Sequence, residues 1–269
     1  MRVHFKRGCP ASAGGCNMID EAGDVPQSEM RLAGGSEKTK TIAVGIILAA
    51  LYCVAALIPV SPFIGPLGFT SSLTMAIFIA PLFGMLLGPF RGFLYGLLGG
   101  VIAAFVSPLY LLVPTVILGP AVSGLMTGLC LRPVTRIGSM KVPGPTITVV
   151  YLLLITVLYE IPNYEAWWFM VLYIVAAVVA GVLQVSRVQM GPSQTSAWGI
   201  LPLSLVGTIT DFSMMTMGAV YLLGIPALVF GTVIFPVMLV ERLAATAISA
   251  IIAVTVFRVF PELWAAKLQ

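Results

Sequence analysis

A succession of long apolar stretches, beginning at about Thr39, constrains the fold of this chain more than any other feature. Stretches of about 18 or more apolar residues are typical of helices that span a lipid bilayer. Closed β-barrels also span membranes, but their strands alternate apolar and polar residues. Runs such as 149–158 and 171–183 show no such alternation. The sequence therefore predicts an all-α fold, a polytopic bundle of transmembrane helices.

The composition excludes an ordinary water-soluble domain. Hydrophobic residues make up 59% of the chain and charged residues 9%, whereas soluble domains carry about a quarter of their residues as charges. A formal net charge of +4 would suggest anionic partners in a soluble protein, but most of the basic residues lie between the apolar stretches. There they are expected to orient the chain in the membrane. We therefore expect a lipid bilayer, and no nucleic acid, as a partner.

Hydropathy and helix-breaking residues predict up to eight spans. They cover residues 40–60, 71–88, 90–107, 109–131, 146–161, 165–184, 198–222 and 235–258. The number stays between six and eight because the sequence leaves open whether 146–184 forms two full spans. Residues 39–260 are then the transmembrane helical domain, 1–38 a disordered cytoplasmic tail and 261–269 a short cytoplasmic tail.

The basic residues between spans predict the orientation. With an even number of spans, one side of the membrane receives the lysines and arginines Arg31, Lys38, Lys40, Arg91, Arg132, Arg136, Lys141, Arg187, Arg258 and Lys267. The loops on the opposite side contain no Lys or Arg, and Glu160 and Glu165 lie at a span edge there. The positive-inside rule places both termini in the cytoplasm. The expected location is the cell membrane, with multiple passes.

Several kinds of site have no sequence support. The four cysteines suggest no disulfide framework, and His4, Cys9 and Cys16 form only a weak candidate for a metal site. The motifs of metalloproteases, serine hydrolases and phosphate-binding ATPase loops do not occur. We therefore expect no enzymatic activity, no catalytic residues, no cofactor and no metal.

The segment 61–72, SPFIGPLGFTSS, is too rich in Pro and Gly for a helix and too apolar for an ordinary solvated loop. Irregular backbone at membrane depth is tolerated where it is buried in protein or lines a cavity. The segment is thus a candidate wall or lid of an outward-facing pocket, and a plain extracellular turn is the alternative. The same argument applies to 223–236. Aromatic residues on this face, among them Phe63, Phe69 and Tyr110, could stack against a ring-shaped ligand.

Only three ionisable residues lie well inside predicted spans, namely Asp211, Glu241 and Arg242. A charge at the bilayer centre costs at least about 2.5–3.5 kcal/mol, so such residues usually face the bundle interior and mark a functional site. One arrangement pairs Arg242 with Asp211 and leaves Glu241 for a cationic group or in its protonated form. Another leaves Arg242 to bind a carboxylate. A purely structural ion pair is a third possibility.

Small residues at helical spacing form a ridge on the first predicted span. The ridge consists of Gly45, Ala49 and Cys53. Helix axes approach closely along such ridges. The sequence leaves two uses open, which are packing within the chain and docking of a partner's helices.

Two stretches resemble the substrate-binding S components of energy-coupling factor (ECF) transporters. They are IPVSPFIGPLGFTSSLTMAIFIAPLFGMLLGPFRGFLYGLLGG and GTITDFSMMTMGAVYLLGIPALVFGTVIFPVMLVERLAATAISAIIA. The first resembles the loop after helix 1 that closes over the substrate in this family, and the second its last two helices. The family has six helices, fewer than the spans predicted here.

This resemblance implies the roles of particular residues. It implies a loop wall made of Phe63, Gly65, Pro66, Gly68, Phe69 and Thr70. It implies polar pocket groups at Asp211, Glu241 and Arg242, and it places the ridge Gly45, Ala49 and Cys53 where the family docks its coupling subunit.

The function that the resemblance implies is capture of a vitamin or similar small molecule at the outer face. Uptake would then need a transmembrane coupling subunit and two ATPase subunits. The alternative is a stand-alone ion-coupled secondary transporter that uses Asp211 or Glu241 as its ion site, although the first half of the chain has no convincing counterpart of Asp211. A membrane enzyme acting on lipid is a third hypothesis, with too few buried polar groups to support it.

Overall fold

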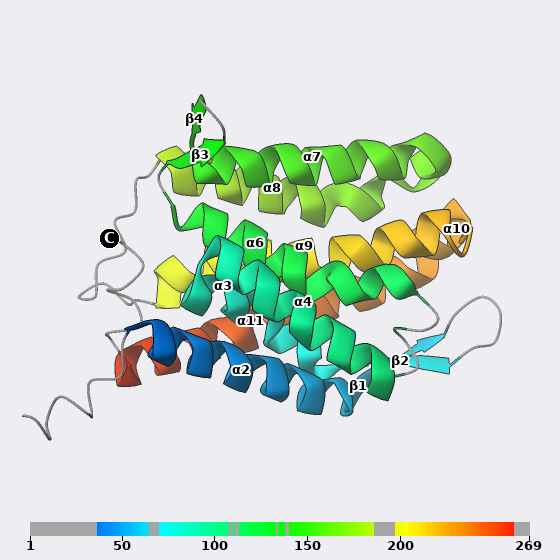
Figure 1. Cartoon of the computed structure of the whole chain (residues 1–269). Helices are drawn as coiled ribbons and strands as arrows, with labels where there is room; N and C mark the ends of the chain where they lie inside the picture. The colour runs from blue at the N-terminus through cyan, green and yellow to red at the C-terminus, as the bar shows by residue number, and fades with distance from the viewer. Residues whose placement is uncertain are drawn as a thin grey trace, which may run out of the picture.

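The computed structural model describes residues 37–64, 70–107, 110, 113–132, 134–137, 140–185 and 197–260. Within these ranges the chain forms a bundle of helices (Figure 1). The longer helices are α2 (Glu37–Ala56), α3 (Ala80–Leu87), α4 (Pro89–Val106), α6 (Gly119–Cys130), α7 (Gly144–Asn163), α8 (Val171–Val185), α9 (Ala197–Tyr221) and α11 (Phe235–Val259). Of the tail predicted at 1–38, only residues 37 and 38 are described, and they belong to α2, whereas the tail predicted at 261–269 lies outside the described residues.

Short elements connect the helices. They are the 3-10 helices η1 (Met75–Phe78), η2 (Pro114–Leu118) and η3 (Tyr164–Met170), the single turn α10 (Ala227–Val229), the π-helix η5 (Phe230–Ile234) and the strands β1 (Pro59–Ile64), β2 (Thr70–Thr74), β3 (Thr135–Ile137) and β4 (Met140–Val142). The strands form two antiparallel hairpins, β1–β2 and β3–β4. The prediction of an all-α fold therefore needs these two small hairpins added to it.

Five helical stretches among the described residues are long and apolar enough to cross a membrane. They are Thr39–Ala56, Pro89–Val106, Gly144–Val185, Gly199–Tyr221 and Ala227–Val259. The third contains both α7 and α8, which η3 joins across non-helical backbone at Ala166 and which lie side by side (Figure 1). These apolar helices confirm the prediction of a multi-pass helical membrane protein. The predicted number of spans stays a prediction.

Two predicted helices begin later than expected. The span predicted at 71–88 is helical only from Met75, with α3 starting at Ala80, and the span predicted at 109–131 has its α-helix from Gly119. In the first case β2 pairs with β1 instead of joining the helix. Both α-helices carry a proline in their first turn, Pro81 and Pro120, where the missing N–H leaves no helical hydrogen bond unmade.

The two segments predicted to be irregular behave differently. In the first, the described residues 61–64 and 70–72 are non-helical as predicted, but they belong to paired strands in which Phe63 pairs with Ser71 and Ile64 with Thr70. The second prediction is wrong from Ala227 onward. There α10 and η5 continue into α11 as one helical stretch, which is separated from α9 by residues 222–226, including Gly224 with a φ of 60°. A glycine adopts this left-handed conformation at the end of a helix without a steric penalty.

Glycines allow α3, α4 and α6 to pack closely. A methyl group added to Gly84 of α3 would collide with the carbonyl oxygen of Gly124 in α6, and one added to Gly124 would lie 2.6 Å from the carbonyl oxygen of Gly92 in α4. Small residues let helix backbones approach in this way inside membranes. The three helices therefore form a tight unit beside the central helix α9, which contacts α3, α6, α7, α8 and α11.

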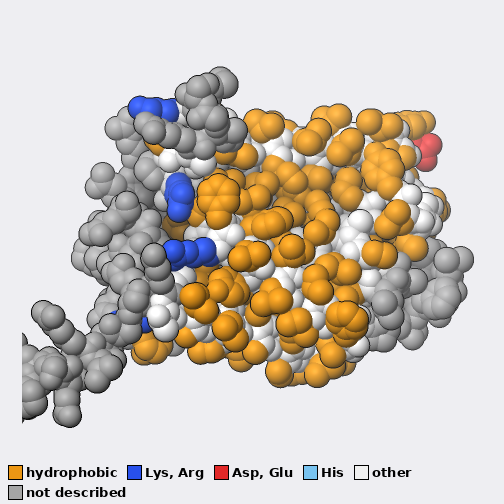
Figure 2. Space-filling model, in the orientation of Figure 1, with side chains coloured by type: hydrophobic (Ala, Val, Ile, Leu, Met, Phe, Trp, Pro, Cys, Tyr) orange, Lys and Arg blue, Asp and Glu red, His pale blue; other side chains and the backbone are white. Residues whose placement is uncertain are grey.

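The surface separates apolar and charged side chains. Exposed apolar side chains cover the face seen in Figure 2, as expected of a surface that contacts lipid. The Lys and Arg side chains gather at the end of the bundle where α2 begins and α11 ends, and an acidic side chain lies at the other end (Figures 1 and 2). The chain thus has a basic end, and the β1–β2 hairpin lies at the opposite end (Figure 1).

Candidate functional site

Arg242 of α11 and Asp211 of α9 form an ion pair inside the bundle. Arg242 Nη1 lies 3.6 Å from Asp211 Oδ2, and the two side chains are 1% and 11% exposed. Of the arrangements that the sequence left open, the structure therefore contains the pairing of Arg242 with Asp211. Direct charge-assisted hydrogen bonds between such groups measure about 2.7–2.9 Å. The pair is loose by comparison.

The guanidinium group of Arg242 has few other partners. It lies 4.3 Å from the centre of the Phe212 ring, and Nη1 donates to the carbonyl oxygen of Thr208 over 3.3 Å. Its Nε is buried and has no hydrogen-bond partner. An arginine carries five N–H donors, and at least the one on Nε is unused inside the bundle.

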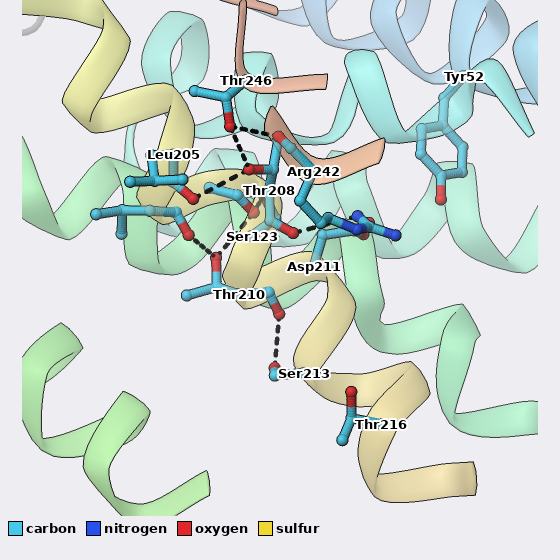
Figure 3. Close-up of polar contacts among 12 residues, drawn as sticks. Tyr52, Ser123, Leu205, Thr208, Thr210, Asp211, Ser213, Thr216, Arg242 and Thr246 are labelled. Carbon is cyan, nitrogen blue, oxygen red and sulfur yellow. Dashed lines mark hydrogen bonds and ion pairs between the residues drawn. The ribbon is translucent and has the colours of Figure 1, made fainter. Parts of the chain in front are cut away.

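A seam of hydroxyl groups between α9 and α11 holds Arg242 in place (Figure 3). Thr246 donates to the carbonyl oxygen of Arg242 one turn before it, and its hydroxyl lies 3.0 Å from that of Thr208. Ser204 donates to the carbonyl oxygen of Thr246 over 2.9 Å. Sequence reasoning missed this seam. Its signal was the spacing of Ser204, Thr208 and Asp211, which places all three on one face of a helix.

A small cavity opens beside the ion pair. Its walls come from α2, β2, η1, η2, α9, α11 and the segment after α4, and they consist of Tyr52, Thr74, Ala76, Ile77, Tyr110, Val116, Asp211, Phe212, Met215 and Arg242. The space that the centre of a water molecule can reach measures about 20 Å³. About 10–15 Å³ is needed for one water molecule. The cavity therefore has room for water and not for a vitamin.

Two tyrosines close one side of this cavity. The hydroxyl groups of Tyr52 and Tyr110 lie 2.8 Å apart, and both residues are buried. Tyr110 was a candidate wall residue from the sequence, and the structure places it in the wall. Tyr52 was not predicted, since a tyrosine in a span has no distinctive pattern around it. In Figure 3 the Arg242 side chain extends toward the side on which Tyr52 lies.

Glu241 does not line this cavity. Its side chain is 8% exposed, and neither carboxylate oxygen has a hydrogen-bond partner. Neighbouring residues of a helix point about 100° apart, which explains why Arg242 faces the cavity and Glu241 does not. The sequence predicted the three charged residues as one polar pocket, and the structure brings together Asp211 and Arg242.

The predicted loop wall is described only in part. Phe63 and Thr70 lie in the paired strands β1 and β2. The other predicted wall residues, Gly65, Pro66, Gly68 and Phe69, lie outside the described residues. Thr74 at the end of β2 is buried and lines the cavity, so the hairpin adjoins the candidate site through this residue.

The ridge for which partner docking was one alternative contacts α4 of the same chain. A methyl group added to Gly45 would lie 2.6 Å from the ring of Tyr95 in α4, and Ala49 is 2% exposed. The Cys53 thiol donates to the carbonyl oxygen of Gly99, also in α4, over 3.6 Å. These contacts with α4 fit the alternative of packing within the chain, and docking of a coupling subunit stays a prediction.

No group of three or more His, Cys, Asp or Glu side chains that could hold a metal ion occurs in the part of the chain that the structure describes. Comparisons with family models, with curated proteins and with solved structures found no match to this chain.

Proposed function

We propose that this chain is the membrane-embedded substrate-capture subunit of an ECF-type importer, which binds a vitamin or similar small molecule. The observation that carries this proposal is the cavity between α2, α9 and α11, which is lined by an ion pair and by two tyrosines with hydrogen-bonded hydroxyl groups inside the bundle. Buried polar groups in a membrane are costly and are commonly retained for function. The resemblance of the two sequence stretches supplies the class of transporter.

The position of the cavity supports capture from outside the cell. Tyr52 lies in the last third of α2 and Arg242 in the first third of α11. The other ends of both helices lie at the basic end of the bundle (Figure 1). If the basic end faces the cytoplasm, as the positive-inside rule predicts, the cavity lies nearer the outer face.

Binding requires the cavity to enlarge. Sites for small molecules usually measure about 300–1,000 Å³, far more than the space beside Arg242. The short helices η1 and η2 form part of the wall and have weaker hydrogen-bond geometry than α-helices. We expect them to separate from α9 and α11 when a ligand enters.

The test is to purify the full chain alone and with co-expressed coupling and ATPase subunits. Binding of a vitamin panel is measured on the isolated chain, and uptake is measured in liposomes. Binding by the chain alone, with uptake only in the ATP-supplied complex, is the expected result. Uptake by the isolated chain under an ion gradient alone would overturn the proposal.

A stand-alone ion-coupled transporter is the second candidate, and Glu241 is the observation that favours it. Its carboxylate is 8% exposed and has no hydrogen-bond partner, as expected of a group that exchanges a proton or a sodium ion. The same liposome assay separates the two candidates. In this second case Glu241→Gln abolishes gradient-driven uptake, and ATPase subunits have no effect.

A further inference from the structure

The cavity presents a donor and an acceptor side by side. Arg242 supplies N–H donors and Asp211 a carboxylate acceptor, and the two atoms of closest approach are 3.6 Å apart. That distance leaves both groups short of a direct hydrogen bond. A carboxamide or ring lactam carries a carbonyl acceptor and an N–H donor on neighbouring atoms. Such a group accepts from Arg242 and donates to Asp211 at the same time.

The charges of the pair select against ions. Asp211 and Arg242 together have no net charge when both are ionised, and both line the cavity. A carboxylate or phosphate bound to Arg242 would place two negative charges in contact in a poorly solvated space, and like-charge contacts cost several kcal/mol. A cation at Asp211 would meet the guanidinium in the same way. An uncharged hydrogen-bonding group meets neither penalty.

The remaining walls favour a flat ring. The Phe212 ring lies under the guanidinium group, and the buried Tyr52 and Tyr110 close another side. Ile77 and Met215 add apolar surface. Ligand sites commonly combine apolar and aromatic walls with a few polar groups that set orientation.

Building on the proposed function of this cavity, we infer that Asp211 and Arg242 select a planar ring that bears an uncharged carboxamide or lactam edge, and that they discriminate against its anionic and cationic analogues. The pair thereby determines the substrate class.

Three small molecules of almost the same shape test this inference. Nicotinamide carries an uncharged carboxamide, nicotinate a carboxylate on the same ring, and 1-methylnicotinamide a cationic ring with the same carboxamide. Their binding to the purified full chain in nanodiscs is measured by titration calorimetry. We expect nicotinamide to bind at least about tenfold more tightly than either ion, even if its Kd is only about 1 mM. Equal or tighter binding of either ion, or no binding of nicotinamide at that level, overturns the inference.

Variants of Asp211 and Arg242 test whether these residues select the ligand or only stabilise the fold. Asp211→Asn removes the competing carboxylate beside Arg242, so nicotinate should gain about tenfold relative to nicotinamide. Arg242→Gln should weaken nicotinamide and nicotinate alike. A purely structural role predicts that Asp211→Asn weakens all three probes equally, and that result also overturns the inference. Glu165→Gln, at an exposed position outside the cavity, is the matched control and should change nothing.

The relative affinities of the unmodified chain for the three probes test the inference even if a variant fails to fold. Failure of the inference is also distinguishable from failure of the proposed function. Selective binding of nicotinamide without ATP-dependent uptake in any subunit combination contradicts only the proposed importer. ATP-dependent uptake of a substrate that binds through a carboxylate on Arg242 contradicts only the substrate class.

Discussion

The hydroxyl group of Tyr52 in α2 lies 2.8 Å from that of Tyr110 in the segment after α4, and both side chains are buried beside the cavity. This hydrogen bond joins two parts of the chain that are 58 residues apart in sequence. The two tyrosines line the same cavity as Asp211 of α9 and Arg242 of α11. The hydrogen-bonded tyrosine pair therefore helps to form the wall of the candidate site.

Removal of either hydroxyl should destabilise the fold. Tyr52→Phe leaves the Tyr110 hydroxyl buried without its partner, so we expect a loss of about 0.5–1.5 kcal/mol in the free energy of unfolding. Tyr110→Phe should cost a similar amount, and the double variant less than the sum of the two. Denaturant titration in detergent measures all three. The control is Tyr95→Phe, since the Tyr95 hydroxyl makes no hydrogen bond to a described residue. Additive losses would contradict a direct bond.

Removing one partner of the buried ion pair between Asp211 and Arg242 should lower the stability of the fold. Asp211→Asn leaves the Arg242 guanidinium, 1% exposed, without its counter-charge, and loss of one partner of a buried pair costs about 3–5 kcal/mol. The loose geometry places our expectation near the lower value. Replacing both residues, as Asp211→Asn with Arg242→Met, should be less damaging than Asp211→Asn alone. Thermal unfolding in detergent measures the order, and a double variant less stable than the single one would contradict this account.

Close packing by glycine predicts a contrast between two similar substitutions. Gly84→Ala places a methyl group against the carbonyl oxygen of Gly124, so we expect a loss of about 1–3 kcal/mol from overpacking. Gly181→Ala in α8 meets nothing within 4 Å and should be neutral or stabilise by about 0.4–1 kcal/mol. Both variants are compared by their midpoint of unfolding. Equal midpoints would show that α3 and α6 are not in close contact.

The hydroxyl seam predicts that two threonines of α11 differ in importance. Thr246 is 4% exposed and lies 3.0 Å from the Thr208 hydroxyl, whereas the exposed Thr255 bonds only within its own helix. Thr246→Val should cost about 0.6 kcal/mol, the average measured for hydrogen bonds between helices in membranes, and at most about 1.7 kcal/mol. Thr255→Val should have no measurable effect on unfolding. A loss as large at Thr255 would show that the seam does not join α9 to α11.

The predicted orientation is open to chemical labelling. In a variant whose four native cysteines are replaced, a single cysteine is introduced at Glu165 or at Arg132, two exposed positions. If the positive-inside rule holds, a membrane-impermeant maleimide labels the cysteine at 165 in intact cells. It labels the cysteine at 132 only after the cells are permeabilised. The reverse pattern would place the basic end outside.

Much of the helix placement was predictable because hydropathy and helix-breaking residues act locally. The expected spans 146–161, 198–222 and 235–258 correspond to α7, α9 and α11 with ends that differ by at most two residues. The starts of α3 and α6 were not predictable in this way. The start of α3 is displaced because residues 70–74 pair as β2 with the preceding strand β1, and whether a segment pairs as a strand depends on its surroundings more than on its own composition.

The sequence by itself determined that this chain has the apolar helices of a membrane protein. It also determined that the charged residues well inside the predicted spans are Asp211, Glu241 and Arg242, where a charge is energetically costly. Only the tertiary structure decided that Arg242 meets Asp211, that Glu241 stands apart, and that Tyr52 joins the site. The physical reason is that hydropathy depends on neighbouring residues, whereas contacts between side chains depend on how each helix is rotated and where it crosses the others. The ridge on α2 shows the same division, since its spacing predicted a close contact but not that α4 would make it.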